Sequence, residues 1–91
     1  MTAIELLKNT EPTIAHTVSQ KALIASVDAK HVDDLKDLAD RFGISVTMIV
    51  HAQQIIRQMP DAVFEMMDDK KNTVGKVYRQ MILQDANYNS K

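Results

Sequence analysis

The sequence predicts a mainly helical protein, and three observations support this fold class. Apolar residues recur at helical spacing between residues 32 and 42 and again between residues 46 and 59. The chain contains only two glycines and two prolines, so it has few natural breaks. Its 91 residues, 45% hydrophobic and 25% charged, have the size and balance of one folded domain. We therefore expect a single domain over residues 1–91.

Several functional classes are disfavoured by composition. The chain has no cysteine, so neither a disulfide framework nor thiol chemistry is expected. No stretch approaches the roughly 18 apolar residues of a membrane span, and the start lacks the pattern of a secretory signal, so we expect a cytoplasmic protein without membrane contact. The three histidines are scattered, and no nucleophile stands beside a base. We therefore predict no metal, no cofactor, no catalytic residues and no enzyme activity.

The net charge of −1 conceals an uneven distribution. Residues 31–69 hold eight acidic and three basic side chains, whereas residues 70–91 hold five basic and one acidic. Phosphate binding needs clustered positive charge, so the total charge does not by itself indicate a nucleic-acid partner. The acidic helices and the C-terminal helices are instead candidate surfaces for a protein partner.

The N-terminal arm, residues 1–20, precedes a central motif at residues 21–59. Residues 3–8 predict a short helical turn, and residues 13–20 are ambiguous. In residues 21–27 the alanines favour a helix, but the bounded apolar run ending at Val27 favours a strand. A short N-terminal strand followed by helices is the preferred prediction, and an all-helical chain is the alternative.

The next helix is expected to begin after Asp28, a plausible N-cap, and to end at Gly43, which tolerates the left-handed conformation of a helix end. Its apolar face is Val32, Leu35, Leu38, Ala39 and Phe42. Ser45 caps a second helix over residues 46–59, with an inner face of Ile49, Ala52, Ile56 and Met59. Residues 60–91 should form C-terminal helices, one near 61–69 and one from residue 72 or 73, before a frayed tail at 84–91.

The central helices carry a pattern of residues suited to a tight crossing. It comprises a small residue, Ala39, a turn at Gly43, an apolar plug, a serine cap, and buried positions at Ile49 and Ala52. In these positions the sequence resembles the helix-turn-helix family of bacterial and phage regulators. That resemblance implies that the second helix enters the major groove of DNA. By position, its DNA-facing residues would be Ser45, Val46, Thr47, Val50, His51 and Gln54.

The same region, from residue 22 to about residue 56, also resembles ribbon-helix-helix repressors. The matching features are Val27-Asp28, Leu35, Leu38-Ala39, the Gly43-Ile44-Ser45 turn and Thr47. In that family two chains pair their strands, and the outward strand side chains read DNA. The resemblance implies readers at Ala22, Ile24 and Ser26, a phosphate contact from Lys21, and a phosphate held by the backbone at residues 45–47. The side chains of Ala22 and Ile24 cannot hydrogen-bond to a base. This weakens the prediction of specific DNA binding more than it weakens the prediction of the fold.

Two functions follow from these observations. The first is a dimeric, sequence-specific DNA-binding transcriptional regulator of the repressor type, with double-stranded DNA as its partner. The fold would then be ribbon-helix-helix-like with extra C-terminal helices or, alternatively, an all-α helix-turn-helix domain. The second is a small helical interaction module, such as an inhibitor or adaptor, that keeps the motif as a scaffold for binding a protein.

Overall fold

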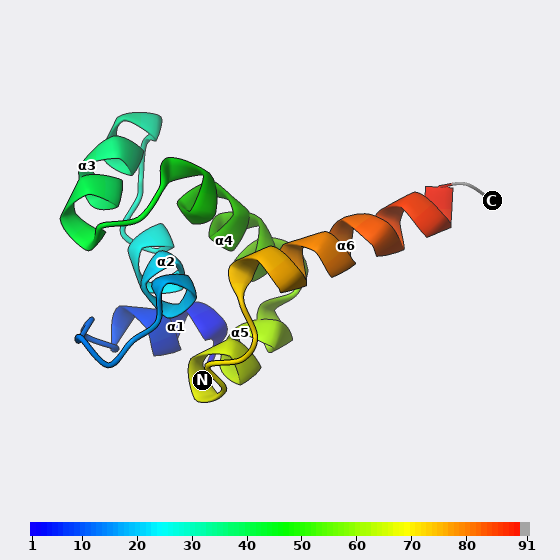
Figure 1. Ribbon diagram of the computed structural model, residues 1–91, viewed down its shortest axis with the longest axis horizontal. Helices are drawn as coiled ribbons and strands as arrows, with labels where there is room; N and C mark the ends of the chain where they lie inside the picture. Colours follow the sequence, from blue (N-terminus) through cyan, green and yellow to red (C-terminus); the bar gives the residue numbers. More distant parts are fainter. Residues whose placement is uncertain (90–91) are drawn as a thin grey trace.

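The protein is mainly helical. The computed structural model describes the backbone of residues 1–89 and the side chains as far as Gln84. Within that part there are six helices and no strand: α1 (Ala3–Lys8), α2 (Val18–Ser26), α3 (Val32–Phe42), α4 (Val46–Gln58), α5 (Pro60–Asp68) and α6 (Val74–Asn89). Helices α1 to α5 gather into one body, and α6 crosses α4 and then extends away from it (Figure 1). None of the described helices combines the length and apolar character needed to cross a membrane.

Helix α2 forms the centre of the core, and the strand predicted at residues 21–27 is wrong. Thr17 caps the helix by accepting the Gln20 backbone N–H, and the Gln20 side chain accepts the Thr17 N–H in return. Seven of its nine residues are buried. An apolar run buried on every side shows no helical periodicity, which is why the pattern resembled a strand.

Buried polar side chains of α2 tie the C-terminal helices to the core. The Gln20 side-chain amide donates to the backbone carbonyls of Met66 and Met67 at 3.1 and 3.2 Å. The Ser19 hydroxyl accepts the backbone N–H of Val74, the first residue of α6, at 2.9 Å. These bonds satisfy polar groups that would otherwise be buried without partners, and they fix where α5 ends and α6 begins.

Helix α3 begins later than its sequence suggested. Its N-cap is His31, not Asp28, because the Asp34 carboxylate accepts the backbone N–H groups of both Lys30 and His31 at 3.0 Å. Asp28 instead follows the end of α2, with its N–H donating to the Ala25 carbonyl. Val32, predicted to face inward, is 81% exposed, since the helix has barely begun there.

The turn between α3 and α4 follows the prediction closely. Gly43 adopts the left-handed conformation at φ 68°, and the Ile44 N–H returns to the Ala39 carbonyl at 3.0 Å. Ala39 is buried, as a close helix crossing requires, and Ser45 caps α4. Ile49 is then buried against α2 and α3, and Ala52 and Ile55 are buried in the core formed with α1, α2, α5 and α6.

Proline and the C-terminal part complete the fold. Pro60 occupies the first turn of α5, where its missing N–H is tolerated. Val74, Val77 and Met81 bury one side of α6. The α6 backbone is helical as far as Asn89, so the helix extends into the tail predicted at residues 84–91. Residues 90–91 of that predicted tail lie outside the described part.

Candidate nucleic-acid interface

The first turn of α4 is an exposed part of the predicted motif. Ser45, Val46 and Thr47 are all exposed, although α4 is central to the packing. The Ser45 hydroxyl accepts the Met48 backbone N–H at 3.2 Å, which holds the helix start in a fixed orientation. A helix N-terminus carries partial positive charge and N–H groups directed outward. This turn therefore presents hydroxyl donors and a favourable dipole to an anionic partner.

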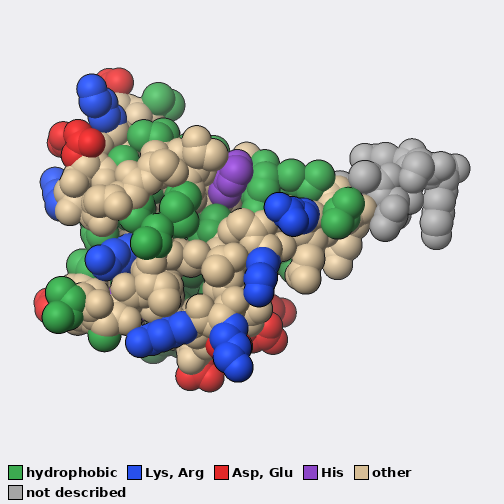
Figure 2. All heavy atoms as spheres, in the orientation of Figure 1, with side chains coloured by type: hydrophobic (Ala, Val, Ile, Leu, Met, Phe, Trp, Pro, Cys, Tyr) green, Lys and Arg blue, Asp and Glu red, His purple; other side chains and the backbone are tan. Residues whose placement is uncertain are grey.

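An outward face continues along α4 beyond this turn. Thr47, Val50, Gln54 and Arg57 are exposed or half-buried and follow one another at helical spacing. The helix contains no aspartate or glutamate. On the side of the molecule that Figure 2 shows, acidic side chains lie near α3, near α5 and beside the N-terminal arm, and none lies over the middle, where α4 lies. A polyanion could therefore approach α4 without meeting a carboxylate on that helix.

His51 has a different environment from the other predicted readers. Its ring stacks on Tyr78 of α6, with ring centroids 3.7 Å apart and planes 8° from parallel. The side chain is half-buried where α4 and α6 meet. One face of the imidazole is therefore occupied, and only the remaining ring surface is available to a ligand. The sequence did not predict the part played by Tyr78, because it lies 27 residues after His51 and no sequence pattern indicates that the two rings stack.

The residues predicted to read DNA from a strand are not on the surface. Ala22, Ile24 and Ser26 are 0%, 3% and 5% exposed within α2. The Ser26 hydroxyl donates to the Leu23 carbonyl at 2.7 Å and is satisfied within its own helix. The basis for a reading role of these three residues, an exposed strand, is absent from the described chain.

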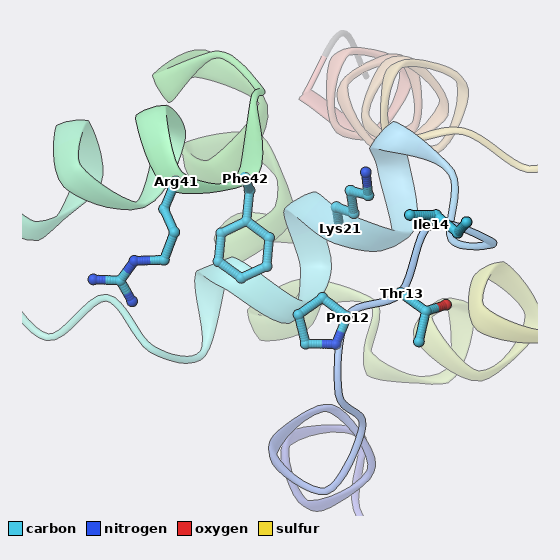
Figure 3. A pocket seen from close by; sticks show the side chains of 6 residues that line it. All are labelled: Pro12, Thr13, Ile14, Lys21, Arg41 and Phe42. Atoms are coloured by element: carbon cyan, nitrogen blue, oxygen red, sulfur yellow. The ribbon is translucent and has the colours of Figure 1, made fainter.

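Lys21 is half-buried, unlike its neighbours in α2. With Arg41, Phe42 and residues 12–14 of the arm, it lines a cleft of about 350 Å³ (Figure 3). Lys21 and Arg41 extend on opposite sides of the Phe42 ring and in different directions. They do not converge on one ligand atom, but both add positive charge beside the end of α3, next to the turn that leads into α4.

The described side chains offer no other centre of chemistry. They contain no group of three histidine, cysteine, aspartate or glutamate residues able to hold a metal ion. The pKa of Asp34 is held below its usual range by the two backbone N–H groups it accepts, first that of His31 and then that of Lys30. That shift stabilises the start of α3 and creates no reactive group.

No family model, curated protein or solved structure matches the chain.

Proposed function

We propose that the chain is a sequence-specific DNA-binding regulator of the repressor type, which acts as a dimer and uses α3, the Gly43 turn and α4 as a helix-turn-helix unit. The observation that carries the proposal is the outward face of α4. It is acid-free, its capped first turn is exposed, and it follows a turn with the backbone conformation that such a unit needs. Of the two folds considered from the sequence, only the all-helical one is compatible with α2.

In this proposal α4 lies in the major groove with its first turn toward the bases. Ser45, Thr47 and Gln54 donate or accept hydrogen bonds at base edges or phosphates, and Val46 and Val50 contact thymine methyl groups. Stacked on Tyr78, His51 stands at the edge of the reading face. A dimer would place two such helices about 34 Å apart on successive turns of DNA, and would therefore bind a repeated half-site.

A gel-shift assay tests the proposal directly. Purified protein is mixed with DNA from its own upstream region and non-specific competitor, at about 50 and about 200 mM salt. The proposal expects a discrete, competitor-resistant shift that weakens as salt rises, because phosphate contacts release counterions. No shift at either salt, from protein shown to be folded by circular dichroism, would contradict it.

A matched pair of variants locates the interface. Thr47→Glu places a carboxylate on the exposed first turn of α4 and should weaken DNA binding by at least about tenfold through repulsion of phosphate. Gln80→Glu adds the same charge at an exposed position of α6 and should leave binding close to the unmodified level. Equal effects from the two variants would indicate a general charge effect rather than contact through α4.

A second function, a protein-interaction module, is favoured by one observation. Ile82 and Leu83 of α6 are 47% and 55% exposed, and they supply apolar surface that the proposed DNA contacts do not use. This alternative expects binding to a protein partner with little salt dependence and no response to DNA competitor. Two results together would favour it: no DNA shift in the gel-shift assay, and capture of a protein partner that resists salt. The variant Ile82→Asp should abolish that capture.

A further inference from the structure

A second cleft opens on another side of α4, between α1, the α2–α3 loop and the C-terminal half of α4. Its volume is about 540 Å³, within the range of small-molecule sites. Three separate elements contribute to it, and residues far apart in the sequence meet there. None of the base or phosphate contacts proposed above comes from a side chain that lines it, although Arg57 also ends the outward face of α4.

The lining of this cleft is basic. Lys8 comes from α1, Lys30 from the α2–α3 loop and Arg57 from α4, and none of the lining residues is acidic. This is notable in a chain with net charge −1, because residues 31–69 hold only three basic side chains and Arg57 is one of them. The Asp34 carboxylate is close enough to interact with the Lys30 charge. However, it accepts backbone N–H groups at the start of α3 and does not line the cleft.

The remaining lining residues indicate what kind of anion would fit. Gln53 adds an amide donor beside Arg57, whereas Ile4 and Ile56 provide apolar surface. Three cations and an amide match the several oxygens and multiple negative charge of a phosphate group better than a single carboxylate. The apolar surface and the volume leave room for an organic group attached to it. We infer that this cleft binds a phosphate ester through Lys8, Lys30 and Arg57.

Such an ester could come from two sources. One is the sugar-phosphate backbone of DNA, and this source rests on the proposed function. Arg57 lies seven residues after Val50 and 11 after Val46, so it continues the outward face of α4 and would meet the strand flanking the groove. The other source is a small phosphorylated molecule, which would link α1 and the loop to α4.

Nuclear magnetic resonance titration of the full chain tests the inference. The probe is glycerol 3-phosphate, added at constant ionic strength against sodium chloride. The expected result is saturable shifts of the Lys30 and Gln53 amides and of the Arg57 guanidinium. The double variant Lys30→Gln/Arg57→Gln, at two exposed positions, should weaken these shifts by about tenfold or more.

The double variant Lys70→Gln/Lys71→Gln removes the same charge from exposed positions outside the cleft and should leave the affinity unchanged. A parallel titration with a 20-base-pair duplex identifies the source. Duplex shifts at the same amides, lost in Lys30→Gln/Arg57→Gln, identify the DNA backbone. Ester binding with no duplex shift at the cleft identifies a small molecule, and if the duplex binds nowhere, the proposed function fails while this inference stands. The inference is overturned if neither probe shifts the cleft amides, or if both double variants weaken binding equally.

Discussion

Helices α2 and α4 pack against each other and both lack acidic residues, but they use their side chains differently. In α2, seven of nine residues are buried, including a serine and a glutamine bonded to other helices. In α4, only Ile49, Ala52 and Ile55 are buried, and the opposite side faces outward from Thr47 to Arg57. Almost all of α2 is therefore used in packing, whereas α4 has one buried side and one outward side.

This difference shows why apolar content alone does not distinguish a fully buried helix from one with an exposed side. Both predicted DNA-reading segments contain valine, isoleucine and alanine. What separates them is whether polar positions recur on one side of the helix. They do so in α4 and do not in α2.

The largest expected effect is the loss of a side chain from the centre of α2. Leu23 is fully buried in the core, and Leu23→Ala should lower the free energy of unfolding by about 2–5 kcal/mol through lost transfer energy and a cavity. The matched truncation Val46→Ala, at the exposed start of α4, should change it by no more than about 0.5 kcal/mol. Urea denaturation followed by circular dichroism measures both. Similar values for the two variants would remove the distinction between the helices.

Two glutamines provide the next test. Gln20→Ala in α2 removes the donors to the Met66 and Met67 carbonyls and should cost about 1–3 kcal/mol of stability. Gln54→Ala in α4 should leave stability within about 0.5 kcal/mol and instead weaken binding in the gel-shift assay. A variant at Gln54 that unfolds the protein but leaves DNA affinity per folded molecule intact would contradict the assignment of its side chain to the binding surface.

Substitutions at two glycines distinguish backbone strain at the end of α3 from an ordinary helix position. Gly43 has φ 68°, so Gly43→Ala should destabilise the protein by about 1 kcal/mol even though no atom lies within 4 Å of the added carbon. Gly75 in α6 has no such strain, and its added carbon would meet only the Thr73 hydroxyl at 3.9 Å. Gly75→Ala should therefore stabilise the protein by about 0.5–1 kcal/mol. Thermal unfolding distinguishes the opposite signs.

The sequence predicted the α3–α4 region better than the rest for physical reasons. Gly43, Ser45 and Pro60 act locally, so they mark helix ends without reference to other elements. Residues 21–27 could not be assigned in the same way, because their helix is set by burial against α4 and by bonds to residues more than 40 positions away. The predicted start of α3 was wrong because the N-cap is His31, and the Asp34 carboxylate inside the helix, not that of Asp28, accepts the backbone N–H groups that precede it.

The candidate sites follow the same division. The exposed first turn of α4 was predictable, since a capped helix start after a tight turn is a local feature. The stack of His51 on Tyr78 and the meeting of Lys8, Lys30 and Arg57 depend on how α1, α4 and α6 pack. No spacing in a single sequence encodes those contacts.

The smallest expected effect concerns the segment that connects α2 to α3. The folded-state pKa of Asp34 lies below its usual value. Its ionised form therefore stabilises the fold fully at pH values above the usual pKa of an aspartate. This contribution should be lost as pH falls through the depressed pKa, when the carboxyl group takes up a proton and the Lys30 and His31 N–H groups lose a charged acceptor. Amide hydrogen exchange at these two residues, measured at decreasing pH and corrected for the intrinsic exchange rate, should show protection falling there before the α4 core opens. Asp34→Asn should remove this pH dependence, and Asp33→Asn should retain it because Asp34 is still present. If protection at both residues stays constant while α4 opens first, the Asp34 carboxylate does not fix the start of α3, and the boundary must come from packing of α3 on α2 and α4.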